Sequence, residues 1–442
     1  MSGIEVGSLM FAIMLALMVL RIPIGIAMFS VGFGGYAYLT GGNFLALLNS
    51  LKDLAYARLS NYDLVVIPLF LLMGQFATHG GLSKALFRFV SAFLGHRKGG
   101  VAIAAIGACA GFGAICGSSL ATAATMGQVA LPELRRYGYS GALATGALAA
   151  GGTLGIMIPP SVPLVIYAIL TQESIGKLFV AAVIPGLIAM AGYMLVVRIV
   201  VALDPRAGPA GARVPWAERL KTTIQVLPVM LVFVVVIVGI YGGWANPTEA
   251  AAIGAAACGI LAVVNGMRRD GLVASALGTA QATAMIFLVL LGADMLNTTL
   301  ALSQMPVELA TWVKDSGMPP FLVMFMILLI YIFLGCVMDS LAMILLTIPI
   351  FYPLVMGLDF HGMPQVDKSI WFGILALMVV EIGLVHPPVG MNVYIINRLA
   401  RDVPLTQTFK GVIPFLMSDA VRIVLLVSFP VISLYLVHAF QH

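Results

Sequence analysis

Long apolar runs separated by short polar or basic stretches extend over the whole chain. Eight of them approach the roughly 20 helical residues that a hydrocarbon core requires: residues 6–20, 23–38, 64–77 and 177–201 in the first half, and 223–241, 249–264, 283–302 and 411–436 in the second. This pattern predicts an all-α protein that crosses a membrane many times. Two stretches, residues 43–59 and 270–281, are more polar than these runs and are typical of amphipathic helices lying along a membrane surface.

A ninth apolar run, residues 141–170, is interrupted at its centre. Gly155-Ile156-Met157-Ile158-Pro159-Pro160-Ser161 places two prolines where a membrane helix would continue. Each proline removes an amide donor and clashes with the preceding turn, so the helix must open here. Opened backbone is tolerated in a bilayer only where protein or a polar cavity satisfies its polar groups. A simple proline kink is the alternative to a functional break.

A second copy of this interruption favours function over a kink. Gly383-Leu384-Val385-His386-Pro387-Pro388-Val389 lies inside the apolar run 369–397, in the second half of the chain. Val183-Ile184-Pro185 likewise recurs as Val412-Ile413-Pro414, and the spacing between the two motifs is almost the same in both halves. Two broken helices in corresponding positions of two halves are typical of secondary transporters, in which they form the binding site.

Two further segments predict re-entrant hairpins, which enter and leave the membrane on one side. Residues 101–134 carry Gly117-Ser118-Ser119 near their middle and lie between the basic pairs Arg97-Lys98 and Arg135-Arg136. Residues 319–357 contain no Lys or Arg. Because basic residues favour the cytoplasm, we expect the first hairpin to enter from inside and the second from outside. Two short spans joined by an outer turn are the alternative for the first.

The predicted architecture is therefore an inverted repeat of two five-span halves, each with a re-entrant hairpin and a broken helix. Residues 1–201 form the first half, 223–442 the second, and the basic, proline-containing stretch 202–222 is a cytoplasmic linker. Five crossings are an odd number, so the second half is upside down relative to the first. This arrangement places both termini outside the cytoplasm.

Composition supports a membrane protein, and the motifs expected of an enzyme are missing. Of the 442 residues, 61% are hydrophobic and only 9% are charged, and the net charge of +5 comes from basic residues that mark topology. The four cysteines lie in apolar segments without metal-ligand spacing, and no disulfide framework is indicated. No Walker loop, HExxH motif or serine nucleophile with a suitably placed histidine is present, so we expect neither ATP hydrolysis nor another enzyme activity.

The hairpin tips and the helix breaks are expected to meet near the middle of the membrane. Carbonyl and hydroxyl oxygens there suit hard cations such as sodium, and half-helix N-termini favour the carboxylate of an anionic substrate. The candidate residues are Ser118, Ser119, Thr122, Gly155 and Ile158 in the first half, and Asp339, Ser340, Gly383 and His386 in the second.

Asp339 carries the most information among these residues. An aspartate at the centre of a membrane helix costs about 2.5–3.5 kcal/mol on insertion scales, so it needs a partner. We interpret it as a cation ligand, with a structural helix cap as the alternative. Asp294 is compatible with capping, pairing or cavity lining, Glu381 lies close to the second break, and Glu249 is interpreted as a structural residue at a helix N-terminus. His386 is compatible with proton or anion binding and with a simple hydrogen bond.

These motifs, taken together, resemble the large membrane subunit of tripartite ATP-independent periplasmic (TRAP) transporters, the DctM-type permease. The resemblance covers almost the whole chain and is carried by Gly117-Ser118-Ser119-Leu120-Ala121, Gly152-Thr153-Leu154 followed by the first break, Met338-Asp339-Ser340, and the second break with Gly390-Met391-Asn392.

The resemblance implies an elevator-type secondary transporter in the bacterial inner membrane that imports a small organic acid, such as sialic acid or a C4-dicarboxylate. Sodium ions would be the coupling ions, and no other cofactor is implied. The implied partners are a small four-helix membrane subunit (Q type) and a periplasmic substrate-binding protein (P type). Family sodium sites at the tips and breaks add Pro160 and Pro388 to the sodium candidates, and Thr122, Ser161 and Asn392 become candidates for the substrate.

Two positions depart from the family pattern. Thr122 stands where an aspartate is frequent, and His386 stands where a threonine often supplies a hydroxyl, so the side-chain contribution at the second sodium site is in question. Two other functions stay open at this point. One is a self-sufficient sodium- or proton-coupled anion symporter, and the other is a passive anion channel.

Overall fold

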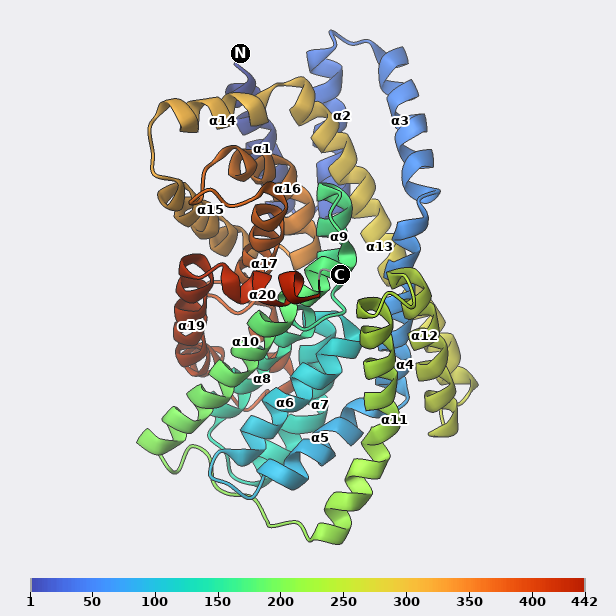
Figure 1. The fold of residues 1–442 in the computed structure, drawn as a ribbon, viewed down its shortest axis with the longest axis vertical. Coiled ribbons are helices and arrows are strands. Elements are labelled where there is room, and N and C mark those ends of the chain that lie inside the picture. The colour runs from blue at the N-terminus through green and yellow to red at the C-terminus, as the bar shows by residue number, and fades with distance from the viewer. Residues whose placement is uncertain (1, 441–442) are drawn as a thin grey trace.

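The computed structural model describes residues 2–440, and within them it contains twenty α-helices, one 3-10 helix and no strand (Figure 1). The helices up to the central linker are α1 (Gly3–Val19), α2 (Ile24–Leu39), α3 (Phe44–Leu59), η1 (Tyr62–Val65), α4 (Val66–His79), α5 (Leu82–Leu94), α6 (Gly100–Cys116), α7 (Ser119–Arg136), α8 (Gly141–Met157), α9 (Val162–Thr171) and α10 (Ile175–Leu203). Those after it are α11 (Trp216–Tyr241), α12 (Pro247–Val264), α13 (Arg269–Leu302), α14 (Met305–Asp315), α15 (Pro320–Gly335), α16 (Ser340–Gly357), α17 (Gln365–Gly383), α18 (Met391–Leu399), α19 (Leu405–Ser428) and α20 (Val431–Ala439).

The apolar runs form helices, which confirms the all-α class. Among residues 2–440, seven helices are long and apolar enough to cross a membrane, or eight when α8 and α9 count as one broken span. With 17 and 16 residues, α1 and α2 fall short of the roughly 20 that a hydrocarbon core requires. The chain is a multi-pass membrane protein, and the number of ten crossings stays a prediction.

Side-chain caps determine where several helices begin. At the start of α7, Ser118 Oγ accepts a hydrogen bond from the amide of Ala121. At the start of α12, Asn246 and Glu249 form a reciprocal capping box, in which each side chain accepts from the other residue's amide at 2.8 Å. The structural role predicted for Glu249 is therefore confirmed.

Two predicted segments are divided into helices differently in the structure. The amphipathic stretch 270–281 and the span 283–302 form one helix, α13, because no glycine or proline separates them. The predicted final span 411–436 is instead interrupted between α19 and α20. Pro430 lacks the amide hydrogen that would continue the helix.

The non-helical part of the central linker is shorter than its predicted extent and is attached to the base of the first hairpin. Helices α10 and α11 leave only residues 204–215 outside regular structure. Ala217, Glu218 and Leu220 are good helix formers and extend α11 toward the linker. The amide of Gly211 donates to the carbonyl of Gly95, and the amide of Gly99 donates to that of Gly208, both at 2.8 Å.

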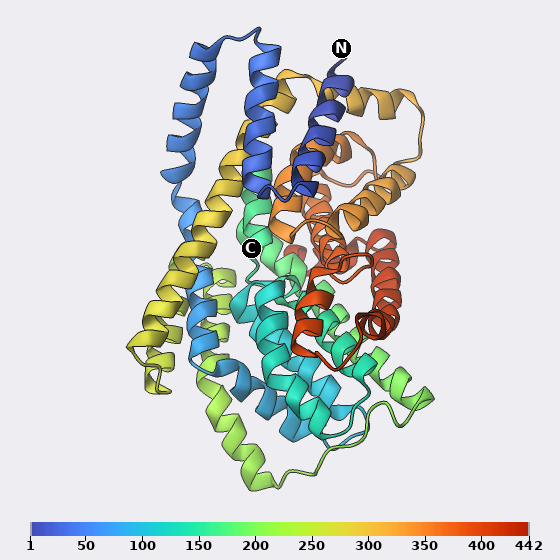
Figure 2. The same ribbon diagram turned by 180° about the vertical axis from the view of Figure 1, so that it is seen from behind.

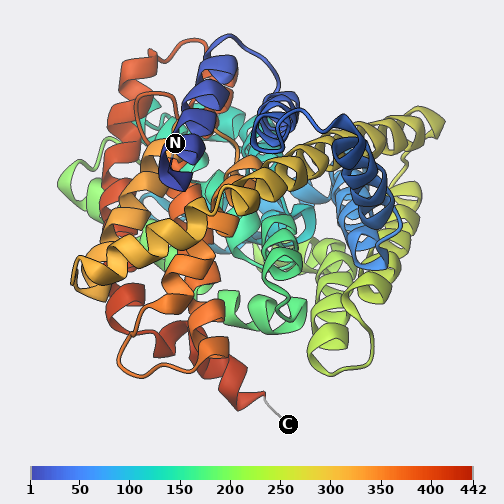
Figure 3. The same cartoon turned by 90° about the horizontal axis from the view of Figure 1, so that it is seen from above.

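The periphery contains two long helix pairs, α2 with α13 and α12 with α4. Figures 1 and 2 both show α2 lying alongside α13, and Figure 3 shows α13 and α14 extending one after the other across the molecule. Glycines bring the first pair together, since a Cβ added to Gly292 would lie 2.3 Å from the carbonyl oxygen of Gly25. Small residues at such contacts are typical of membrane helices.

The interior contains the elements that the sequence marks as unusual. The two-helix units α6/α7 and α15/α16 pack against the broken helices α8/α9 and α17/α18. Residues 143–157 of α8 and 368–383 of α17 are buried along their whole length. The helices that lead into the two breaks are therefore enclosed by protein up to the residues where they end.

Candidate functional site

The first helix break lies between α8 and α9, whose axes are bent by 41°. The amides four residues beyond Gly155 and Ile156 would belong to Pro159 and Pro160, which have no amide hydrogen. Ile158 has an extended backbone, so the helix has ended at this residue. The break thus leaves carbonyl oxygens without their usual helical partners, including that of Gly155.

The turn between α6 and α7 lies directly against this break. Gly117 forms the turn with a φ of +62°. A Cβ added to Gly113 would lie 2.4 Å from the Cα of Gly155, and one added to Gly155 would lie 2.8 Å from Ser118 O and 2.5 Å from Thr122 Oγ1. Only glycine permits so close an approach. The structure thus brings Ser118, Thr122 and Gly155 together.

Four side chains from the hairpin and break elements have an oxygen atom without a hydrogen-bond partner in the described part of the chain: Thr122 Oγ1, Ser161 Oγ, Glu381 Oε1 and Asn392 Oδ1. All four side chains are fully buried. The second oxygen of Glu381 accepts a 2.5 Å hydrogen bond from Ser119 Oγ, and Asn392 Nδ2 donates to the carbonyl of Ala149 at 3.3 Å. Buried oxygens without partners cost free energy. Each of these oxygens is therefore available to a cation or to a hydrogen-bond donor.

The second break, between α17 and α18, is built in the same way. The amide four residues beyond Gly383 would belong to Pro387, and the Gly383 carbonyl accepts instead from the amide of His386 at 3.3 Å. A Cβ added to Gly383 would lie 2.4 Å from the Cα of Gly335, the last residue of α15. Cys336 Sγ donates to the carbonyl of Pro387 at 3.4 Å. The turn between α15 and α16 therefore lies against the second break.

The two breaks differ in exposure. Pro159 and Pro160 are buried, whereas Pro387 and Pro388 are exposed and His386 is half-buried. The first break is therefore packed inside the protein, and the second opens toward its surroundings.

Asp339 caps the N-terminus of α16. Its carboxylate accepts hydrogen bonds from the amides of Leu341 at 3.2 Å and Ala342 at 3.4 Å. Ser340, the first residue of α16, is half-buried. The structural cap, the alternative considered for Asp339, is thus present, while its role as a cation ligand stays a prediction. Ser118 caps α7 in the corresponding place of the first hairpin.

The elements of the two halves interlock across the centre. Helix α7 packs against α18, and α16 packs against α9. Tyr167 on α9 donates to the carbonyl of Ser369 at 2.6 Å. The bond between Ser119 and Glu381 links the first hairpin to the second broken helix. The hairpins and breaks consequently form one packed unit with contacts in both directions.

A buried polar network behind this unit was not singled out from the sequence. Arg422 Nη2 lies 2.8 Å from Asp419 Oδ1, and the two side chains are 3% and 1% exposed. Tyr193 donates to the other Asp419 oxygen at 3.0 Å and lies 3.1 Å from Thr153 Oγ1. The sequence feature that could have revealed this network is a pair of opposite charges three residues apart inside an apolar run.

Asp294 takes two of the three roles considered for it. It forms a bidentate ion pair with Arg58 on α3, and it lines a cavity of about 630 Å³. That cavity is bounded by α3 and α13 on one side and by α9 and α16 on the other. It therefore lies between the peripheral helices and the central unit.

Comparison with known proteins places these features in a family context. Residues 11–432 match the family model described as the tripartite ATP-independent periplasmic transporter, DctM component. The chain is 36% identical over 393 residues to the C4-dicarboxylate TRAP transporter large permease protein DctM of Pseudomonas aeruginosa, with 88% of this chain and 90% of that protein covered. It is 30% identical over 435 residues to the sialic acid TRAP transporter large permease protein SiaM of Vibrio cholerae, with 96% and 97% covered. Both relatives are transporter permeases rather than enzymes.

A solved structure shares the fold. The Alcanivorax borkumensis YdaH transporter superposes with a TM-score of 0.58 at 16% sequence identity, and the match covers 88% of this chain and 89% of that one. At this identity the likeness concerns the fold alone.

Proposed function

Because this chain belongs to the DctM component family of tripartite ATP-independent periplasmic transporters, we propose that it is the large permease subunit of a sodium-coupled system that takes up a small carboxylate. Family membership confirms the resemblance seen in the sequence and the prediction that the chain is not an enzyme. The coupling ion, the substrate and the transport movement are the content of the proposal.

The observation that carries the proposal is the pairing of each two-helix turn with its own helix break. Gly113 meets Gly155 in the first half, and Gly335 meets Gly383 in the second. Gly335 follows Gly113, and Gly383 follows Gly155, by nearly the same number of residues that separates the repeated motifs in the two halves of the sequence. A common contact made twice supports an inverted repeat of two five-span halves, in which the two-helix units are re-entrant hairpins.

Sodium coupling is supported by the kind of atoms that the site offers. The breaks supply carbonyl oxygens, and Thr122, Ser161, Glu381 and Asn392 supply buried oxygens without partners. Hard cations prefer such oxygen ligands. Within residues 2–440 no group of three or more His, Cys, Asp or Glu side chains is placed to hold a metal ion, so a transition metal is not the expected occupant.

A carboxylate substrate is supported by the two half-helix N-termini. Helices α9 and α18 begin immediately after the breaks, at Val162 and Met391. The positive end of the helix dipole favours a negative charge there. Ser161 and Asn392, at those N-termini, are the proposed polar contacts of the substrate. A C4-dicarboxylate is the first compound to test, because the Pseudomonas aeruginosa relative carries that designation.

An elevator movement is supported by the division between periphery and centre. The hairpins and broken helices interlock as one unit, and the cavity beside Asp294 separates part of that unit from α3 and α13. We assign the central unit to the moving transport part and the pairs α2/α13 and α12/α4 to the scaffold. The proposed setting is the bacterial inner membrane, with a small four-helix membrane subunit and a periplasmic substrate-binding protein as partners.

The test is uptake of radiolabelled succinate into proteoliposomes containing the purified chain, with and without the small subunit and the binding protein. An inward sodium gradient is compared with an equal potassium gradient. We expect accumulation only with sodium and with both partners present.

The other outcomes identify the competing functions. Sodium-driven accumulation by the chain alone would make it a self-sufficient symporter. Equilibration of succinate without any cation gradient would make it a passive channel. Sodium-driven accumulation of a different carboxylate, with succinate inert, would correct the substrate and leave the coupling mechanism in place.

A further inference from the structure

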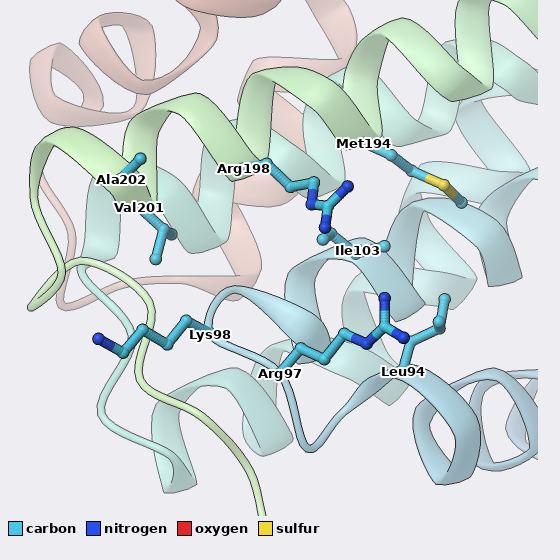
Figure 4. Close-up of a pocket in the computed structure, with 8 residues that line it drawn as sticks. All are labelled: Leu94, Arg97, Lys98, Ile103, Met194, Arg198, Val201 and Ala202. Carbon is cyan, nitrogen blue, oxygen red and sulfur yellow. The ribbon is translucent and has the colours of Figure 1, made fainter.

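A second cavity, remote from the helix breaks, lies at the end of the molecule where α5, α6 and α10 meet. Its volume is about 480 Å³, and it is lined by Leu94, Arg97, Lys98, Ile103, Met194, Arg198, Val201 and Ala202. Figure 4 shows Arg97 and Arg198 extending into the space between the α5–α6 loop and α10, while Lys98 points to another side. Nothing in the proposed transport cycle uses this cavity.

The charges around the cavity have one sign. Three of its eight lining residues are cationic and none is acidic. Within residues 2–440, neither Arg97, Lys98 nor Arg198 forms an ion pair, a side-chain hydrogen bond or a contact with an aromatic ring, and all three are exposed. Cations collected around one space without a carboxylate repel each other. An anion bound between them would remove that cost.

The remaining lining residues are apolar, and two of them, Ile103 and Met194, lie deeper than the cations. Met194 precedes Arg198 by one turn of α10, which places it about 6 Å farther from the end of that helix. Ile103 lies one turn inside α6, while Arg97 and Lys98 lie in the loop before that helix. Val201 and Ala202 lie beside Arg198, nearer the end of α10. The cations therefore lie in the outer part of the cavity, and Ile103 and Met194 form its apolar wall one turn deeper.

We infer that this cavity binds an anionic phospholipid, with the headgroup phosphate held by Arg97 and Arg198 and an acyl chain against Ile103 and Met194. A phosphate accepts hydrogen bonds from guanidinium groups in the bidentate manner that suits arginine. Basic pockets between membrane helices are suited to anionic headgroups. This inference requires only that the chain spans a membrane and does not depend on the proposed substrate or coupling ion.

The apolar wall favours a lipid over a soluble anion. A free phosphate or a small carboxylate would satisfy the cations but would leave Leu94, Ile103 and Met194 without a partner. Cations at the surface with apolar side chains beneath them match a phospholipid, whose charged headgroup lies above its acyl chains in a bilayer. The basic pair that contributes to the cavity is also the one that marks the predicted cytoplasmic side, where anionic lipids attract basic residues.

The test uses native mass spectrometry of the full chain in detergent, titrated with phosphatidylglycerol or with phosphatidylcholine. The variant Arg97→Gln/Arg198→Gln removes both guanidinium groups. The matched control Arg268→Gln/Arg269→Gln removes two positive charges from the predicted cytoplasmic face at the start of α13, outside the cavity. Arg97→Lys/Arg198→Lys keeps the charge and controls for folding, together with the elution profile on size exclusion.

Each basic residue near an anionic membrane surface contributes about fivefold in affinity, so the loss of both predicts roughly 30-fold weaker binding of phosphatidylglycerol. We expect this loss only in the Gln cavity variant, a far smaller one in the Lys variant, and weak binding of phosphatidylcholine throughout. Equal phosphatidylglycerol binding by the cavity variant and the control variant would overturn the inference. So would equal binding of the two lipids by the unmodified chain. Full displacement of the lipid by glycerol phosphate would show a site for a soluble anion instead.

Discussion

A single added methyl group at Gly155 is expected to separate the first hairpin from its helix break. In Gly155→Ala the new Cβ would lie 2.5 Å from Thr122 Oγ1, 2.8 Å from Ser118 O and 3.0 Å from Thr122 Cβ. Ordinary van der Waals contact begins near 3.4 Å. The nearest atoms must therefore move by about 0.6–0.9 Å, and one of them is a backbone oxygen that cannot rotate away.

The cost of this displacement follows from the packing around it. Overpacking a filled interior costs about 1–3 kcal/mol, which corresponds to roughly 5- to 150-fold in an equilibrium constant. Gly155 and Thr122 are both fully buried, so little relaxation toward the surface is available. The strain falls on the contact that places the proposed ion ligands, and we expect it to weaken apparent sodium affinity as well as thermal stability.

The assay compares Gly155→Ala with Gly111→Ala in the same hairpin. A Cβ at Gly111 would meet only Leu86 Cδ2, at 3.5 Å, so that substitution tests alanine in the hairpin without a clash. Thermal unfolding in detergent, followed by size exclusion, reports stability. The sodium dependence of succinate uptake in the complete system reports affinity.

We expect Gly111→Ala to match the unmodified chain or exceed it in stability, because alanine favours a helix over glycine by about 1 kcal/mol. Gly155→Ala should unfold at a lower temperature and need more sodium for half-maximal uptake. If both variants behave like the unmodified chain, the close approach of hairpin and break does not position the site, and the reasoning fails.

Three further predictions address other parts of the chain. Asp339→Asn keeps a good N-cap but removes the charge, whereas Asp339→Ala removes the cap and the charge. The two variants should insert into the membrane and lose sodium-dependent uptake. Only the alanine variant should also lose about 1 kcal/mol of stability. Normal uptake by the asparagine variant would leave Asp339 with a capping role alone. Arg422→Met leaves the Asp419 carboxylate buried and uncompensated and should lower the free energy of unfolding by about 3–5 kcal/mol. The double variant Asp419→Asn/Arg422→Met should lose less. Additive losses in thermal unfolding would speak against coupling of the two residues. A cysteine introduced at Arg135 should react with an impermeant reagent only from the cytoplasm and one at Asp359 only from outside, while the four native cysteines are buried; labelling of both from one side would contradict the inverted arrangement.

Sequence periodicity and proline positions predicted the elements of the fold well, because each depends on local chemistry. The apolar runs became helices, and both Pro-Pro motifs became helix interruptions. The boundary at residue 282 was wrong because a change from amphipathic to apolar character does not end a helix when helix-forming residues continue through it. Pro430 did end a helix, for the same reason that Pro159 does.

The tertiary partners of the site residues could not be predicted in the same way. Ser119 and Glu381 lie in different halves of the chain, and nothing local in either stretch specifies their hydrogen bond. The ion pair between Arg58 and Asp294 also depends on how α3 packs beside α13. The pair of Asp419 and Arg422 differs from these, because its spacing is visible in the sequence.

The hydrogen bonds between the two halves of the chain affect how the central unit would move. If each hairpin contacted only its own break, the two halves of the centre would be free to shift separately. Instead Ser119 of the first half donates a hydrogen bond to Glu381 of the second, and Asn392 of the second half donates one to the carbonyl of Ala149 in the first. Hydrogen bonds therefore join the two halves of the centre. Glu381 and Asn392 also carry two of the buried oxygens without partners. An ion that bound these oxygens would therefore stabilise the joint between the halves, and binding and movement of the central unit would be coupled through the same atoms.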